Sequence, residues 1–207
     1  MPTNYLQQIS DAYAHLRKDK ALRPLLNTVG RISIVPAPEP SPLQSLAQSI
    51  TSQQLNGKAA ASIFSRLLAM YGGDLDAERI LETGEDDLRS VGLSMAKAAS
   101  IKDLAEKAIA GVVPSWKELR KMGDEEIIER LTQVRGIGRW TVEMLLIFSL
   151  GRPDVWPVDD FAIKRAFALY FGGAEPPKRA ELIARAEGWS PWRSVVARCL
   201  WRYLDEV

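Results

Sequence analysis

The most informative part of the chain is LTQVRGIGRWTVEMLL, residues 131–146. An apolar helical face ends at Val134, two glycines flank Ile137, and a second apolar helix follows. Glycine accepts positive φ angles and lets another backbone come close, so Gly136 and Gly138 predict a tight hairpin turn. The second helix would present free N–H groups and the positive end of its dipole at that turn, which suits a phosphate. The stretch therefore predicts two helices joined by a hairpin (residues 134–138) that can hold a phosphate backbone.

The whole string, and not only the glycine pair, resembles the helix-hairpin-helix motif of DNA-binding proteins. The plainer interpretation is an ordinary helical turn that contains two glycines. By the resemblance, the backbone carbonyls of Thr132, Val134 and Ile137 surround a structural Na⁺ or K⁺ that helps to hold the phosphate. The resemblance also assigns DNA contacts to residues of the turn and the following helix: Gly136, Gly138, Arg139 and Thr141.

Composition limits the chemistry that the chain can perform. Its 207 residues, 46% of them hydrophobic, suffice for one well-packed domain or for one domain of two lobes. The single cysteine, Cys199, and the single histidine, His15, exclude an internal disulfide, a four-cysteine metal site and a two-histidine metalloprotease motif. Acid–base chemistry would have to come from carboxylates, lysine, tyrosine or a cofactor. A net charge of +1 means that nucleic acid would be bound by a local patch and backbone amides.

No targeting or membrane segment is expected. The sequence lacks any run of about 18 apolar residues, which predicts that no helix spans a membrane. Residues 1–16 contain neither the basic nor the apolar region of a secretory signal. We therefore expect a cytoplasmic protein, associated with the nucleoid if it is bacterial.

Helical periodicity runs along the whole chain, with strand-like alternation only at residues 32–35. A proline-rich segment, residues 36–42, predicts a stiff connector, and Ser41 and Ser94 are predicted N-caps. The predicted helices cover about residues 4–17, 42–53, 58–70, 77–82, 85–91, 95–110, 124–133, 139–150, 160–171, 178–187 and 191–204.

Two aspartates, Asp159 and Asp160, follow a Gly/Pro loop and open a helix. An aspartate at a helix start is ordinarily an N-cap, and taken alone that interpretation would be preferred. The order of hairpin, helix, Gly/Pro loop and aspartate-led helix resembles the helix-hairpin-helix DNA glycosylase superfamily. The 22 positions from Gly138 to Asp160 resemble the spacing of its alkyladenine branch. By this resemblance Asp160 is the catalytic carboxylate, and Asp159 has a supporting or capping role.

Four strings resemble 3-methyladenine DNA glycosylase II. They are QSITSQQLNGKAAASIF (48–64), VGLSMAKAASI (91–101), VRGIGRWTVEMLLIFSLGRPDVWPVDD (134–160) and WSPWRSVVARCLWRYL (189–204). The likeness covers roughly residues 41–204. The segment before the connector is too short for the N-terminal β-rich domain of larger members, so the chain resembles the compact form.

The pattern also separates the branches of the superfamily. Bifunctional members carry a catalytic lysine where this chain has Trp140, and no lysine lies between Lys121 and Lys164. A Schiff-base lyase step needs a neutral amine beside the sugar, and none is available at that place. Iron–sulfur members need four cysteines. Both absences favour a monofunctional glycosylase.

The resemblance implies a base-flipping device. The wedge turn (residues 52–55) would fill the hole that the flipped base leaves, through Gln53, Gln54 or Leu55. The sequence does not choose among these three residues. The alternative is an ordinary turn between two helices. Arg139 and Lys97 lie near predicted helix starts, and each is either a phosphate contact or a solvated charge.

The flipped base needs a pocket. By resemblance Trp140 and Trp201 line it, and Phe161 and Met144 add to it. Bases alkylated at N3 or N7 carry positive charge, so stacking on tryptophan would gain a cation–π term of about 0.5–2 kcal/mol. Core packing is the alternative for each tryptophan. Met144 stands where some members have tyrosine, which suggests a pocket open enough for bases methylated on the pairing edge.

The expected fold is all-α: a two-lobed helix-hairpin-helix DNA glycosylase with its active site in the cleft between the lobes. We expect one domain over residues 1–207, with a helix and connector (1–40), a first lobe with the wedge turn (41–120) and a second lobe with the hairpin and Asp160 (121–207). The expected partner is double-stranded DNA with alkylated bases, bound by a monomer without a required cofactor. The alternatives are a glycosylase that also cleaves the strand, a non-catalytic hairpin DNA-binding protein and a helical scaffold protein.

Overall fold

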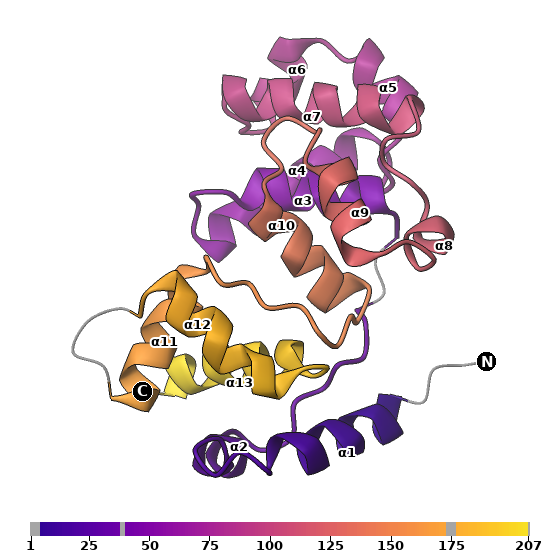
Figure 1. Ribbon diagram of the computed structural model, residues 1–207. Coiled ribbons are helices and arrows are strands. Elements are labelled where there is room, and N and C mark those ends of the chain that lie inside the picture. Colours follow the sequence, from indigo (N-terminus) through magenta and orange to yellow (C-terminus); the bar gives the residue numbers. More distant parts are fainter. Residues whose placement is uncertain (1–4, 38–39, 173–176, 207) are drawn as a thin grey trace. The chain divides into compact units, whose positions relative to one another are not determined.

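The computed structural model describes residues 5–37, 40–172 and 177–206. Within these ranges every regular element is a helix, which confirms the predicted all-α class (Figure 1). Residues 32–35 form no strand, because this segment has no partner to pair with and its alternation only turns Ile32 and Ile34 into the core. Among the described residues no helix combines the length and the apolar character needed to cross a bilayer.

Contacts divide the chain into two compact units. One consists of residues 38–142, and the other joins residues 1–37 to residues 143–207. The hairpin therefore belongs with residues 38–142, whereas the predicted division grouped it with Asp160. Arg130, near the end of the first hairpin helix, donates to the carbonyls of Gly111 and Val112, and this ties that helix to residues 38–142. Residues 38 and 39 of the predicted connector lie outside the described residues.

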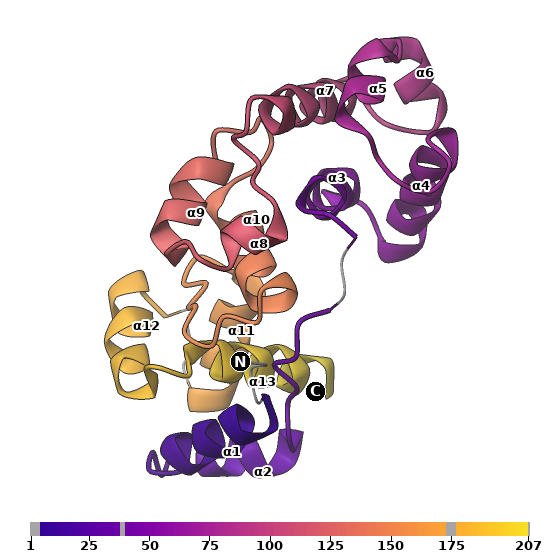
Figure 2. The same cartoon turned by 90° about the vertical axis from the view of Figure 1, so that its right-hand side faces the viewer.

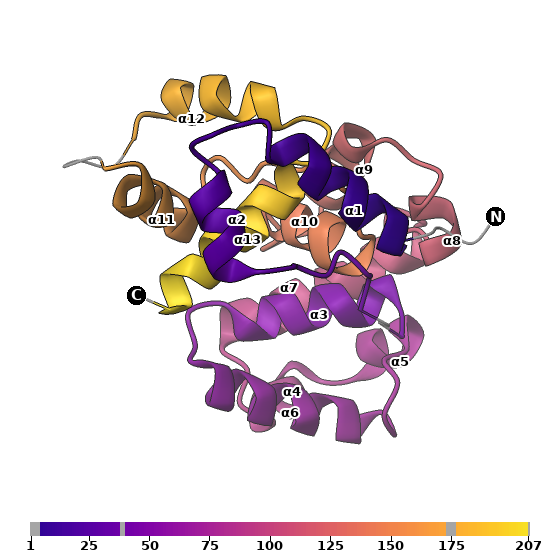
Figure 3. The same ribbon diagram turned by 90° about the horizontal axis from the view of Figure 1, so that it is seen from below.

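The unit of residues 38–142 is built around one long helix. Its helices are α3 (Pro42–Ser52), α4 (Gly57–Met70), α5 (Ala77–Glu82), α6 (Glu85–Ser90), α7 (Met95–Ile109), α8 (Trp116–Leu119), α9 (Asp124–Leu131) and the start of α10 (Arg139–Met144). α7 packs against α3, α5 and α6, and α3 also packs against α4 (Figure 3). The predicted N-caps are confirmed, because Ser41 Oγ accepts from Gln44 N at 3.1 Å and Ser94 Oγ accepts from Lys97 N at 3.3 Å. The short helix α8, which the sequence analysis missed, begins with a capping box between Ser115 and Glu118.

The second unit contains the C-terminal helices and the N-terminal pair. Its helices are α1 (Tyr5–Leu16), α2 (Arg23–Val29), the π-helical turn η1 (Leu145–Ser149), α11 (Phe161–Phe171), α12 (Arg179–Ala186), the 3₁₀ turn η2 (Glu187–Trp189) and α13 (Arg193–Glu206). α13 packs against both α2 and α11 (Figure 2). Trp189 is fully buried here and contacts the rings of Trp156 and Phe171. α2 was not predicted, because its seven residues are too few for a clear periodic pattern.

Candidate active site

The hairpin has the shape that its glycines predict, but only one glycine is needed for its backbone conformation. Gly136 has φ +80°, and a Cβ on it would lie 3.0 Å from the hydroxyl of Ser100. Gly138 has no such φ, and a Cβ there would meet nothing within 4 Å. Ile137 is buried, as expected for the residue that plugs the turn into the core. Asp103 also holds the turn, because its carboxylate accepts the Arg135 N–H at 2.7 Å.

The predicted cation ligands are neutral carbonyl oxygens, which suit a hard cation such as Na⁺ or K⁺. The Val134 carbonyl accepts the Ile137 N–H at 3.0 Å, which closes the turn. A carbonyl oxygen has two lone pairs, so this bond leaves room for a cation ligand. The donor chemistry of Thr132, Val134 and Ile137 therefore fits such an ion.

Two predicted DNA contacts differ in their surroundings: Arg139 is ion-paired and Thr141 is buried. Arg139 makes a two-pronged ion pair with Glu125 of α9, with one nitrogen 2.9 Å from Oε2. The hydrogen bond from Arg139 lowers the pKa of Glu125. Both side chains are at least half exposed, so solvent screens the pair and it adds little to stability. Thr141 is buried in α10, so its side chain does not face solvent.

The three wedge candidates differ in their surroundings. The side-chain amide of Gln53 donates to the Gly136 carbonyl at 2.7 Å. Gln54 is exposed and has φ +57°, which is uncommon for a residue with a side chain. Leu55 is 40% exposed and borders a small hollow of about 150 Å³ between α3 and α4. Lys97 does not reach outward, because its ammonium binds the carbonyls of Thr51 and Gln53.

Asp160 is both an N-cap and a held carboxylate. Its Oδ1 accepts the Ile163 N–H at 2.7 Å, which caps α11, and the indole N–H of Trp201 at 3.1 Å. Only 6% of the residue is exposed. Asp159 is exposed and forms ion pairs with Lys164 and Arg179 instead. The two neighbouring aspartates are therefore clearly different, and Asp160 is the one that is buried beside an aromatic ring.

Trp201 is held from a second side by a residue that the sequence analysis missed. The ring of Phe148 stacks on Trp201 with centroids 5.6 Å apart and an interplanar angle of 26°. The guanidinium of Arg198 lies 4.8 Å from the centre of the same Phe148 ring. Burial lowers the pKa of Arg198. Phe148 lies on the π-helical turn η1, whose altered helical geometry no propensity pattern predicts, so no sequence signal marked it.

The other predicted pocket residues are distributed over both units. Met144 is half-buried, and Phe161, the first residue of α11, is 79% exposed. Both belong to the unit that contains Asp160 and Trp201. Trp140 belongs to the unit of residues 38–142 and is 47% exposed on α10, which favours a surface role over core packing.

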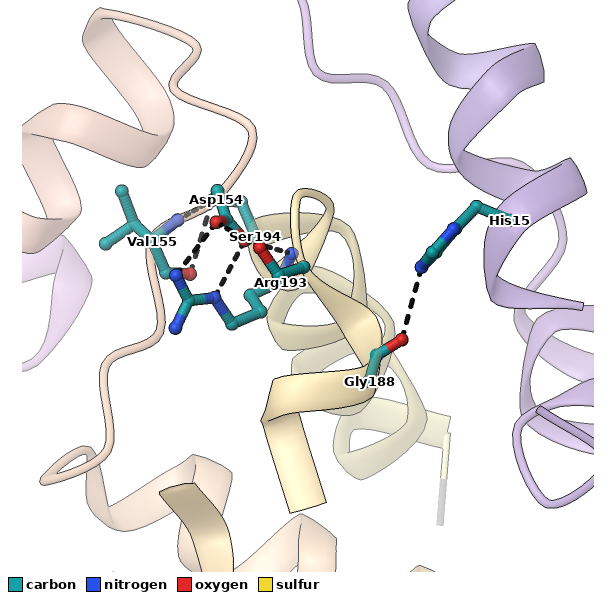
Figure 4. Close-up of polar contacts among 7 residues, drawn as sticks. His15, Asp154, Val155, Gly188, Arg193 and Ser194 are labelled. Atoms are coloured by element: carbon teal, nitrogen blue, oxygen red, sulfur yellow. Dashed lines mark hydrogen bonds and ion pairs between the residues drawn. The ribbon is translucent and has the colours of Figure 1, made fainter. Parts of the chain in front are cut away.

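The loop that leads to Asp160 is fastened to the start of α13 (Figure 4). Arg193 donates to both oxygens of Asp154, at 2.7 and 2.8 Å, and the Arg193 N–H binds the same carboxylate. Ser194 Oγ accepts the Val155 N–H at 2.8 Å. The single histidine, His15, lies apart from these contacts. Among the described residues its ring contacts the Gly188 carbonyl at 3.2 Å.

Acidification should weaken this fastening. Burial raises the pKa of Asp154, but hydrogen bonds from Arg193 and Ser190 outweigh it, so the pKa is lowered below its ordinary value of 3.8. A lowered carboxyl pKa stabilises the fold above the unfolded-state pKa, and this contribution disappears as pH falls through the folded-state pKa. We expect Asp154→Asn to reduce the free energy of unfolding at pH 7 by about 1–2 kcal/mol, and we expect this difference from the parent to shrink as pH falls below 3.8. Urea unfolding followed by tryptophan fluorescence measures both.

The matched control is Asp86→Asn, because the Asp86–Arg89 pair is exposed, with 97% of the Asp86 side chain accessible. This change should leave stability almost unaltered. A difference between Asp154→Asn and the parent that is equally large at pH 3 and pH 7 would contradict the role of the ionised carboxylate.

Comparisons with known proteins place this architecture in a family. Residues 47–191 match the model of the HhH-GPD superfamily of base excision DNA repair proteins. DNA-3-methyladenine glycosylase 1 of Schizosaccharomyces pombe is 39% identical over 163 residues, which cover 78% of this chain and 72% of that protein. The chain therefore belongs to the HhH-GPD superfamily, as its hairpin and aspartate predicted.

Two solved structures carry the same fold. The S. pombe 3-methyladenine DNA glycosylase in complex with abasic DNA aligns with a TM-score of 0.79 and 36% identity, covering 93% of this chain and 95% of that one. A DNA-3-methyladenine glycosidase from Bacillus halodurans aligns with a TM-score of 0.82 and 31% identity, covering 98% and 90%. These alignments confirm the predicted glycosylase fold.

Proposed function

We propose that this protein is a monofunctional DNA glycosylase that hydrolyses the N-glycosidic bond of alkylated bases in duplex DNA and leaves an abasic site. The observation that carries the proposal is the buried carboxylate of Asp160, held by the α11 backbone and by the indole of Trp201. The relatives named above are 3-methyladenine glycosylases, and one of them was solved with abasic DNA. The position where bifunctional members carry lysine is occupied by Trp140.

Asp160 acts on the sugar and not on the base. A base alkylated at N3 or N7 leaves as a neutral group, so the reaction needs no dedicated general acid. The carboxylate of Asp160 stabilises the oxocarbenium-like sugar and orients the attacking water, as carboxylates do in glycoside hydrolysis. The bond from Trp201 fixes the carboxylate in direction before the substrate arrives.

The base would be recognised by stacking. Trp201, with Phe161 and Met144 of the same unit, offers an aromatic face for a cationic base, and Trp140 is a further exposed aromatic ring on α10. An aromatic face favours cationic methylated purines, such as 3-methyladenine and 7-methylguanine. The thioether of Met144 is flexible and adapts to bases of different outline.

The hairpin would bind the DNA backbone through the amides around Gly136 and Gly138, with Arg139 supplying charge. The carbonyls of Thr132, Val134 and Ile137 would hold the Na⁺ or K⁺ that helps to neutralise the phosphate. With Gln53 bound to the hairpin, Gln54 and Leu55 are the residues of the wedge turn that can enter the base stack. Apolar side chains are the usual wedges, so we favour Leu55. The protein would act as a cytoplasmic monomer.

Base release from methylated duplex DNA, with and without a later alkaline step, tests the proposal. Free alkylated base with strand breaks only after alkali is the expected result. Breaks before alkali would establish a glycosylase that also cleaves the strand. No release from any alkylated duplex, with DNA binding retained, would leave a non-catalytic hairpin DNA-binding protein.

A further inference from the structure

A single side chain links the wedge turn to the hairpin, the two segments of the unit 38–142 that are proposed to contact DNA. The Gln53 amide lies at the end of α3, and the carbonyl that it binds, that of Gly136, is in the hairpin. The two residues are 83 positions apart in the sequence and 2.7 Å apart at these atoms. The wedge turn and the hairpin are therefore joined directly, and both belong to one compact unit.

Lys97 fixes the backbone of the same turn. Its ammonium donates to the Thr51 carbonyl at 2.8 Å and to the Gln53 carbonyl at 2.7 Å. The last carbonyls of a helix have no partner within it and carry the negative end of its dipole. The Lys97 ammonium therefore closes the end of α3 and sets the position from which the chain continues into Gln54.

One side of α7 contacts both the wedge turn and the hairpin. Lys97, Ser100 and Asp103 follow one another at three-residue spacing, which places neighbours on the same side of a helix. Lys97 binds the wedge turn, while Ser100 lies against Gly136 and Asp103 binds the Arg135 N–H. α7 is thus a common support, and the Gln53 side chain adds a direct hydrogen bond between the wedge turn and the hairpin.

We propose that Gln53 is a positioning residue that couples the hairpin to the wedge turn, and that it is not itself the wedge. This inference rests on the proposed function. When the hairpin captures a phosphate, the Gln53–Gly136 bond sets where Gln54 and Leu55 meet the base stack. The left-handed backbone of Gln54 agrees with this role, since such a conformation persists in a residue with a side chain only where its surroundings hold it.

Gln53→Ala tests the coupling first in the DNA-free protein. Amide hydrogen exchange should become faster in residues 52–56 and in residues 134–138, because the bond between the two segments exists before DNA binds. Gln133→Ala is the matched control, since the Gln133 amide donates at 3.4 Å to the carbonyl of Glu129, four residues earlier in the same segment. The control should leave exchange in the wedge turn unchanged.

Rates of base excision then distinguish a positioning role of Gln53 from general destabilisation of the fold. With 7-methylguanine opposite cytosine, Gln53→Ala should lower the rate of base release about 3- to 10-fold, the range expected for one hydrogen bond. With the same lesion opposite an abasic site, where little flipping work remains, the rate should stay close to that of the parent. In a Leu55→Ala background the Gln53→Ala effect should largely vanish, because no wedge is left to position.

Two outcomes would overturn the inference. Unchanged exchange in the free protein together with slower release would make Gln53 the wedge itself. Equal losses on both substrates would make it a general support of the fold. Failure of the parent to release any base would refute the proposed function, whereas the exchange measurement would still report on the coupling.

Discussion

Asp160→Asn should release alkylated bases roughly 10²–10³-fold more slowly than the parent, the loss typical of removing one group that stabilises transition-state charge. The fold should survive, because asparagine is as good an N-cap as aspartate. Its side-chain oxygen can accept the same two hydrogen bonds, from the Ile163 N–H and the Trp201 indole. The substitution therefore removes charge and little else. Single-turnover release of 7-methylguanine and binding to the same duplex are the two measurements.

Asp159→Asn is the matched control for this prediction. Asp159 is the sequence neighbour, is exposed and pairs with Lys164 and Arg179, so its neutralisation should change the rate by less than about 2-fold. A parental rate in Asp160→Asn would remove Asp160 from the catalytic role. A large loss of DNA affinity in that variant would show that the carboxylate supports the fold.

Gly136→Ala should weaken both the fold and DNA binding. At φ +80° a Cβ costs about 1–2 kcal/mol in backbone energy, and here it would also press on the Ser100 hydroxyl at 3.0 Å. Because the hairpin must distort, we expect about a 10-fold or greater loss of affinity for duplex DNA, which fluorescence anisotropy can measure. Gly138→Ala should lower affinity with little loss of stability, because its Cβ would meet no protein atom within 4 Å.

Gly111→Ala controls for backbone strain. Gly111 has φ +74° with open space around its Cβ position, and it lies outside the hairpin. Its substitution should lower the melting temperature, because alanine is strained in a left-handed backbone conformation, and it should leave DNA affinity unchanged. A Gly136→Ala protein with parental affinity would show that the shape of the hairpin is not what binds the backbone.

Local patterns predicted most of the helices. They also predicted the order of the hairpin, the Gly/Pro loop and Asp160 along the chain. The hairpin and Asp160 could be found because their meaning depends on spacing along the chain, which the sequence displays directly. The Ser41 and Ser94 caps were equally visible, since the capping side chain and the backbone N–H that donates to it are three residues apart. Boundaries shifted by only a few residues, as in the first helix, expected over residues 4–17 and found at Tyr5–Leu16.

The supporting contacts could not be predicted, because they join residues that are distant in sequence. By sequence Gln53 is one of three wedge candidates, and nothing local shows that its amide reaches Gly136. Lys97 was considered for phosphate contact, but its ammonium is used inside the protein. Phe148 gave no signal, since its contact with Trp201 depends on the π-helical turn.

The π-helical turn η1 limits which sequence changes this part of the chain can accept. An α-helix advances about 100° for each residue, so a π turn behaves as one extra residue within a helix and shifts the phase of everything after it. In η1 this phase shift sets the direction of Phe148. Loss of a single residue from Leu145–Ser149 would restore a regular helix and rotate Phe148 away from Trp201, so this segment should tolerate substitutions better than deletions.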